Sequence, residues 1–298
     1  MHPNEQIPEP PAVQRLLRAQ FPQWADLPLA KVVSDGTDNA LYRLGDKLVA
    51  RFPRVEWAIQ QVAKEAHWLP KFAASLPLAV SAPRAVGEPG EGYPWQWCVA
   101  PWFEGTDARA EELRDLPEAA RDLAQFLRAL QRIDATDGPP AGRANFNRGV
   151  PLTAVDVGVR RAIPHWEETF DTTAITAVWE DALAAPAWGR SPVWLHGDLL
   201  PVNMIANEGR LRAVIDFGCL GVGDPAADLV PAWGLFHGES RRVFREAMQV
   251  DDGTWRRGRG WALRAVGALP YYRETNPGIV ARARHSIIEA VADFEADS

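Results

Sequence analysis

The chain has 298 residues, of which 47% are hydrophobic and 24% are charged, and its formal net charge is −7 at pH 7. This is the composition of an ordinary globular protein of one or two domains. The acidic charge argues against nucleic acid as a partner and leaves room for a cationic substrate, although mild acidity is also common among soluble proteins.

The apolar runs and the cysteines indicate the cellular compartment of the protein. No cationic segment with an apolar core opens the sequence, and no apolar run approaches the length of a bilayer span. Cys98 and Cys219 both lie in apolar, strand-like segments, which indicates buried free thiols in a reducing compartment. We therefore expect a cytoplasmic protein that does not bind a membrane.

The first hundred residues combine helices with short strands. Pro11 opens a helix in which apolar residues recur at helical spacing, and Pro22 ends it. Further along, the pattern predicts three short strands in residues 31–52, a helix in 57–76 and two strands in 83–88 and 96–103. We therefore expect a five-stranded antiparallel sheet with a helix in the N-terminal part of the chain.

Two charged residues of this part, Arg51 and Glu65, fall close to apolar positions. Arg51 ends an alternating strand and shares its face with Val49. Glu65 lies in the middle of the predicted helix, near its apolar side. Spacing alone leaves two alternatives, because Glu65 can pair with Arg51 or be solvated beside Lys64.

From residue 103 onward the pattern is mainly helical. One helix is predicted at residues 116–133 and two more in 153–186, the first of these two being interrupted by Pro164, with a Gly/Pro-rich loop at 137–149 before them. Acidic residues in 153–186 are candidate contacts for a substrate, although a solvated helix face is the more common role of each: Glu167, Glu168, Asp171, Glu180 and Asp181.

The C-terminal third is also predicted to be helical. Asp224 precedes a proline and is expected to cap a helix that carries Asp228 and Trp233. The basic run Arg256-Arg257-Gly258-Arg259 is expected to be a solvated face. The last helix is expected to pack four apolar residues, Ile287, Ile288, Val291 and Phe294.

The strongest chemical signal is the segment VWLHGDLLPVNMIANEGRLRAVIDFG, residues 193–218. Asp198 follows a strand-like run, Asn203 comes five residues later, and Asp216 ends a second apolar run. A turn at residues 207–209 can return Asp216 to the loop that carries the other two. Protein kinases have the motif H-R-D-L-x-x-x-N in their catalytic loop and D-F-G in their metal-binding loop. This segment matches the spacing of both motifs, with Gly197 in place of the Arg.

Phosphoryl transfer explains why these residue types are needed. An Asp accepts the proton of the attacking hydroxyl, and an Asn and a second Asp hold Mg²⁺ on the nucleotide phosphates. Ordinary turn residues at strand ends are the alternative, and HGD alone fits that alternative. HGD, Asn and DFG together favour a site in which Asp198 is catalytic and Asn203 and Asp216 bind the metal.

HGDLxxxN, IDFG and the later GDPAADL at residues 223–229 resemble the aminoglycoside phosphotransferase family, which includes choline-kinase-like and macrolide-kinase-like relatives. The resemblance begins near Val32. It implies an α+β, two-lobed, protein-kinase-like fold, with a nucleotide-binding lobe at residues 1–102 and a mostly helical catalytic and substrate-binding lobe at 103–298. No A-P-E motif follows Asp216, which argues against a protein substrate.

The resemblance gives roles to three residues before the second strand. Ser34, Gly36 and Asn39 match the family's Ser-x-Gly-x-x-Asn loop, which would cover the nucleotide phosphates. The segment has a single glycine, and a plain hairpin turn explains it equally well.

Three further nucleotide contacts are implied by the resemblance. Arg51 occupies the slot of the kinase Lys, where it would contact phosphates while Glu65 positions it. The backbone from Ala100 to Trp102 would be the hinge that reads the adenine edge, with the nucleotide between the lobes.

The resulting hypothesis is an O-phosphotransferase that uses ATP or GTP with Mg²⁺ to phosphorylate a hydroxyl of a small molecule. An aminoglycoside-type antibiotic fits the family name, in which case the enzyme would confer resistance. A macrolide, a choline-like amine, an amino alcohol or a sugar fits nearly as well. The alternative from another class is a nucleotide-binding pseudokinase or scaffold without turnover, which Arg51 and the single-glycine loop favour.

Overall fold

The computed structural model describes residues 5–33 and 38–297 and divides the chain into two compact units. The first unit spans Met1–Ser75, Ala79–Glu104 and Ala213–Gly218. The second spans Leu76–Leu78, Gly105–Arg212 and Cys219–Ser298. The segment that carries Asp216 therefore packs with the N-terminal strands, whereas Asp198 and Asn203 belong to the second unit.

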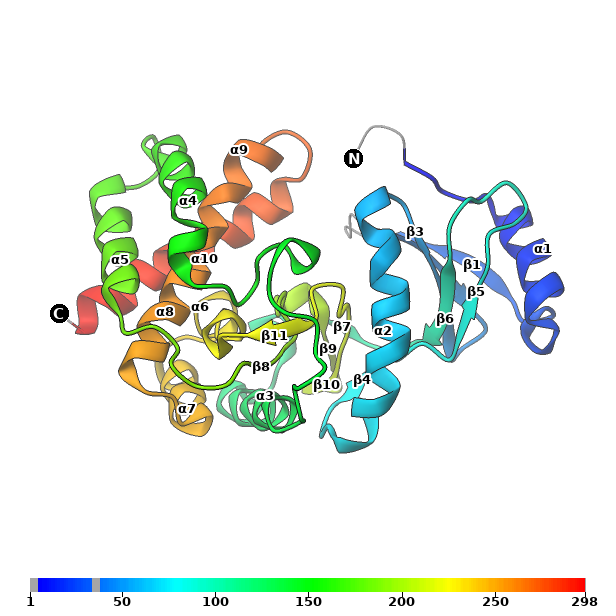
Figure 1. The fold of residues 1–298 in the computed structure, drawn as a ribbon, viewed down its shortest axis with the longest axis horizontal. Coiled ribbons are helices and arrows are strands. Elements are labelled where there is room, and N and C mark those ends of the chain that lie inside the picture. Colours follow the sequence, from blue (N-terminus) through cyan, green and yellow to red (C-terminus); the bar gives the residue numbers. More distant parts are fainter. Residues whose placement is uncertain (1–4, 34–37, 298) are drawn as a thin grey trace. The chain divides into compact units, whose positions relative to one another are not determined.

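The first unit is built on the predicted antiparallel sheet, whose strand order is β1-β2-β3-β6-β5 (Figure 1). The sheet lies between helices α1 and α2. The bounds are α1 Pro10–Gln20, β1 Leu29–Val32, β2 Asn39–Leu44, β3 Leu48–Pro53, α2 Ile59–Phe72, β5 Ala85–Gly87 and β6 Trp97–Pro101. A two-residue strand that the sequence did not reveal, β4 Ala79–Val80, pairs in parallel with Ala213 and Val214.

Strand β3 shows how the sheet separates its two faces. Leu48, Ala50 and Phe52 pack into a core cluster with Leu16 and Leu17 of α1. Side chains alternate along a strand, so Val49 and Arg51 point to the opposite face. That face receives α2, whose Glu65 meets Arg51. The alternation predicted from the sequence therefore has the correct register.

The second unit contains short strands and most of the helices. Their bounds are β7 Thr106–Asp107, α3 Leu116–Gln131, α4 Asp156–Ala162, α5 Thr172–Ala184, β8 Val193–Leu195, β9 Met204–Asn207, β11 Gly221–Gly223, α6 Pro231–Gly234, α7 Gly238–Met248, α8 Asp252–Leu263, α9 Ala268–Tyr272 and α10 Pro277–Asp297. Strand β10, Arg210–Val214, begins in the second unit and ends in the first. β8 pairs with β11 in antiparallel fashion, and β7 pairs with β9. No helix of the described residues combines the length and the apolar character that a membrane span requires.

The basic run in α8 is not a solvated face, so this prediction was wrong. Arg257 and Arg259 are both buried. The Nε of Arg257 lies 2.7 Å from Oδ2 of Asp224, and the Nε of Arg259 lies 2.9 Å from Oδ2 of Asp293. A guanidinium can leave water when a carboxylate replaces its hydration, and here both carboxylates come from segments distant in the sequence.

Two smaller predictions for the C-terminal part also need correction. The expected helix after Asp224 is broken into a 3-10 turn, Pro225–Asp228, and α6, because Pro231 lacks the amide hydrogen that a continuous helix needs. In α10, Ile287 is buried as predicted, but Ile288 is 45% exposed. One residue along a helix turns the side chain by about 100°, which moves Ile288 off the packed face.

Candidate active site

The Arg51–Glu65 pair forms in the first unit, which decides between the two alternatives left open by the sequence. Nη1 of Arg51 lies 2.7 Å from Oε2 of Glu65, and Nη2 lies 3.4 Å from Oε1. Both residues are buried. β3 supplies the cation and α2 supplies the anion, so the pair ties the helix to the sheet and fixes the orientation of the guanidinium.

The surroundings of this pair keep the guanidinium charged. Burial disfavours its charge, but the carboxylates of Glu65 and Asp216 outweigh that effect and raise the pKa of Arg51 above its usual value. Burial raises the pKa of Glu65, Arg51 opposes that rise, and Asp216 adds to it. Across the strand pair, burial raises the pKa of the Cys98 thiol to about 12.

Asp216 lies in a strained turn beside this pair. Its backbone φ is 61°, in the left-handed region that residues other than glycine rarely adopt. Nζ of Lys64 in α2 donates to the carbonyl oxygen of Gly218 at 2.6 Å, which anchors the turn. One helix therefore holds both Glu65 and the turn that presents Asp216. Strain of this kind concentrates at functional sites.

In the second unit, Asp198 and Asn203 lie on one loop that follows β8. Nδ2 of Asn203 donates to the carbonyl oxygen of Asp198 at 2.8 Å and lies 3.3 Å from Oδ2 of the same residue. Since the nitrogen of the amide is used in this way, Oδ1 is the group that Asn203 can offer to a ligand. The side chain of Asp198 is 31% exposed, so a substrate hydroxyl can reach it.

The backbone before Asp198 is held from below by Asp228. Its two carboxylate oxygens accept the amide hydrogens of His196 and Gly197, at 2.7 and 2.8 Å. Burial raises the pKa of Asp228, while the charge of His196 and these hydrogen bonds act against that rise. Asp228 therefore supports the backbone of the loop that carries Asp198.

Gly197 explains why the kinase Arg is missing from this loop. Its φ is 83°, and a Cβ at this position would collide with the carbonyl oxygen of Cys219. No side chain fits there without moving the backbone. A position that carries a charged residue in the kinase pattern is therefore closed in this chain.

Two arginines next to Asp198 were missed by the sequence analysis. Nη2 of Arg148 lies 3.1 Å from Oδ1 of Asp198. Arg264 acts electrostatically with both Arg148 and Asp198, and burial lowers its pKa to about 9. Arg148 comes from the Gly/Pro-rich loop and Arg264 from the end of α8, and neither has a motif that could have marked it.

The other residues predicted to contact the nucleotide have simple structural positions. Ser34 and Gly36 lie outside the described residues. Asn39 begins β2, and Ala100 is buried in β6. The backbone amide of Trp102 donates to the carbonyl oxygen of Lys47 at 2.9 Å, so this amide does not serve an adenine base.

The donor groups fit Mg²⁺ better than a metal that needs a full protein cage. The described residues contain no group of three or more His, Cys, Asp and Glu side chains that could hold a metal ion. Mg²⁺ needs no such group, because it keeps several waters and takes one or two protein oxygens together with phosphates. The first unit offers one such oxygen donor in the carboxylate of Asp216, and the second unit offers another in the amide oxygen of Asn203.

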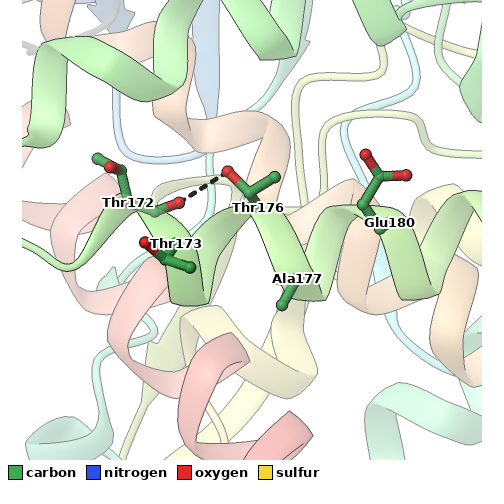
Figure 2. A pocket seen from close by; sticks show the side chains of 5 residues that line it. All are labelled: Thr172, Thr173, Thr176, Ala177 and Glu180. Carbon is green, nitrogen blue, oxygen red and sulfur yellow. Dashed lines mark hydrogen bonds between the residues drawn. The ribbon is translucent and has the colours of Figure 1, made fainter.

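The acidic residues of the helices in 153–186 do not converge on a site. Asp171 caps α5 by accepting the amide hydrogen of Thr173, and Asp181 pairs with Arg256 at 2.7 Å. Glu180 lines a surface depression of α5 together with Thr172, Thr173, Thr176 and Ala177 (Figure 2). One helix supplies every residue of that depression, so its polar groups line a single helix face and do not converge from several elements as in binding sites.

A protein-family model covers most of the chain. The model of the phosphotransferase enzyme family matches residues 30–261. The chain belongs to the phosphotransferase enzyme family. Comparison with curated protein sequences gives no significant match.

Solved structures show which fold this phosphotransferase has. It is similar to the GDP complex of an aminoglycoside 2'-phosphotransferase-IIIa, with a TM-score of 0.71, 17% identity, and coverage of 95% of this chain and 98% of that one. It is also similar to the GDP and kanamycin complex of APH(2")-IIia, with a TM-score of 0.67, 20% identity, and coverage of 96% of this chain and 97% of that one. The third similar structure is a macrolide 2'-phosphotransferase from Brachybacterium faecium, with a TM-score of 0.61, 22% identity, and coverage of 94% of this chain and 97% of that one. The predicted α+β kinase-like fold is confirmed.

Proposed function

We propose that this phosphotransferase moves the γ-phosphoryl group of ATP or GTP to a hydroxyl of a small molecule, with Mg²⁺ as the metal. Asp198 accepts the proton of the attacking hydroxyl. Asn203 and Asp216 hold the metal, which neutralises charge on the phosphates. Cys98 and Cys219 are buried and form no disulfide among the described residues, which supports the reducing cytoplasm as the place where the enzyme acts.

Arg51 and Glu65 complete the nucleotide site in this proposal. Arg51 contacts the phosphates of the nucleotide, and Glu65 fixes the orientation of Arg51. The loop from Ser34 to Asn39 covers the same phosphates. The hinge at Ala100 to Trp102 binds the base through backbone groups other than the Trp102 amide. Catalysis then comes chiefly from positioning and from charge neutralisation, because phosphoryl transfer asks for little covalent chemistry.

The observation that supports this proposal most is the buried Arg51–Glu65 pair beside Asp216. Two buried charges are costly unless each has a partner, and an apolar pair of similar volume would often hold the fold equally well. A scaffold that binds no nucleotide gains nothing from that cost. A nucleotide-using enzyme does gain, because it needs a guanidinium of fixed orientation next to a metal-binding carboxylate.

Two measurements test the proposal against the pseudokinase alternative. The thermal midpoint is measured with ATP or GTP, each with and without Mg²⁺, and phosphate transfer is then assayed with a panel of hydroxylated acceptors. We expect a metal-dependent rise of the midpoint and transfer to at least one acceptor. A metal-independent rise with no transfer to any acceptor would favour the pseudokinase.

The acceptor panel covers the substrate classes that the fold permits. Aminoglycosides and macrolides represent antibiotic acceptors, for which the enzyme would confer resistance. Amino alcohols, choline-like amines and sugars represent metabolites.

A further inference from the structure

Arg264 is a half-buried arginine whose guanidinium lies over the ring of Trp261, 5.4 Å from the ring centroid. Elsewhere in the described chain, deeply placed arginines have their own carboxylates: Arg51 has Glu65, Arg257 has Asp224, and Arg259 has Asp293. No carboxylate of the described residues lies within ion-pair distance of Arg264. Its Nη2 donates to the carbonyl oxygen of Phe146 at 2.8 Å, and its Nη1 is buried without a hydrogen-bond partner.

Arg148 increases this excess of positive charge. Burial is the main cause that lowers the pKa of Arg264, and the nearby charge of Arg148 lowers it further. The Nε of Arg148 is buried without a partner, and Asp198 is its ion-pair partner. Asp228 also lies within electrostatic range of Arg148, but both of its oxygens are used by backbone amides. Two guanidiniums therefore share the single carboxylate of Asp198.

The loop that carries Arg148 is built to hold it in place. Asn145 is buried, its Oδ1 accepts the amide hydrogen of Gly142, and its Nδ2 donates to the carbonyl oxygen of Arg148 at 2.9 Å. Phe146 and Asn147 both have positive φ, which costs free energy that other contacts must offset. A loop held in this way fixes the position of the arginine beside Asp198.

We propose that Arg148 and Arg264 form a subsite for an oxyanion, a carboxylate or a phosphate, carried by the acceptor molecule. This inference rests on the proposed function, because Asp198 has to be the residue that meets the acceptor hydroxyl. A planar guanidinium fork matches the two oxygens of such a group. An acceptor bound here places its hydroxyl at Asp198 and its anionic group on the arginines, and a polycation is repelled.

The test uses nucleotide-free protein and sulfate as the probe, with chloride at the same ionic strength as the reference. Sulfate is expected to raise the thermal midpoint of the wild type. Arg264→Gln and Arg148→Gln are expected to weaken the sulfate response about tenfold, as for a lost charge-assisted hydrogen bond. Arg264→Lys keeps the positive charge and is expected to retain part of the sulfate response. Arg190→Gln, an exposed arginine over Trp188, is the matched control and should respond as the wild type.

Two outcomes of this titration would overturn the proposal. An equal response in all variants would mean an adventitious ion only. A response lost in Arg51→Gln but kept in Arg148→Gln and Arg264→Gln would place the anion at the nucleotide residues instead. If Arg264→Gln does not fold, Arg148→Gln and Arg264→Lys still decide the result.

A second measurement compares gluconate, glucose and glucosamine, which share a hydroxylated carbon chain and differ in charge. The anionic gluconate should stabilise the wild type most, and Arg264→Gln should abolish that advantage. Equal effects, or the largest effect from the cationic glucosamine, would refute the subsite. Failure of Mg²⁺ and nucleotide to bind would instead refute the proposed function, and that is measured separately through Arg51.

Discussion

The side-chain amide of Asn203 donates to the backbone carbonyl of Asp198 at 2.8 Å, so the proposed metal ligand and the proposed catalytic residue are joined directly. The same contact uses the nitrogen of Asn203 and leaves its oxygen for a ligand. Substitution of either residue therefore acts on a shared loop.

Asp216→Ala is expected to abolish the Mg²⁺ dependence of nucleotide binding, because it removes the anionic metal ligand of the proposal. Asn203→Ala should weaken that dependence less, because a neutral ligand is lost. The thermal midpoint with nucleotide, measured across a Mg²⁺ titration, checks both. An unchanged response to Mg²⁺ in Asp216→Ala would show that another group binds the metal.

Asp198→Ala is expected to lower turnover by roughly a hundredfold or more, the usual loss when a group that takes the proton is removed. Nucleotide binding should stay close to that of the wild type. Single-turnover phosphate transfer and a nucleotide titration are the two measurements. Turnover within a few fold of the wild type would remove Asp198 from the mechanism.

Arg51→Ala is expected to weaken nucleotide use, whereas Arg51→Lys should retain part of it, because Lys keeps the charge and loses the fork. Arg51→Ala should also lower the free energy of unfolding by about 3–5 kcal/mol, since Glu65 is left buried and unpaired. Nucleotide titrations and urea unfolding separate the two effects. The pseudokinase alternative expects nucleotide use to be indifferent to both substitutions.

Asp228→Ala is expected to lower the free energy of unfolding by about 3 kcal/mol, because the buried amides of His196 and Gly197 lose a charged acceptor. Asp252→Ala is the control, since that side chain is 90% exposed and its pairing with Arg245 lies at the surface. Urea unfolding curves measure both. Equal midpoints for the two variants would contradict the supporting role of Asp228.

The thiol of Cys98 is expected to resist alkylation in the folded protein. With its pKa raised to about 12, fewer than about one thiol in a thousand is ionised at pH 8.5, and only the thiolate reacts. A Cys219→Ser variant isolates this thiol, and iodoacetamide labelling followed by mass spectrometry measures it. Labelling should become fast in denaturant, and fast labelling without denaturant would show that the strand opens.

The sequence by itself determined the local structure and the motif residues. The alternation in β3 predicted that Arg51 and Val49 share a face, and the apolar stripes predicted α1, α2 and α3, because both signals depend on neighbours within a few residues. The spacing of Asp198, Asn203 and Asp216 marked the motif for the same reason. The bounds of the short strand β4 were not visible, because its partner strand lies far along the chain.

The tertiary structure alone decided which charges are paired. Glu65 could pair with Arg51 or face water, and only the packing of α2 on the sheet settled the choice. The basic run around Arg257 has the sequence of an exposed face, but Arg257 is buried in the structure, where it pairs with the distant Asp224. Arg148 and Arg264 carry no motif, and folding brings them to Asp198 from segments on either side of it in the chain. The energy of a charge depends on its neighbours in space, which the order of residues along the chain does not contain.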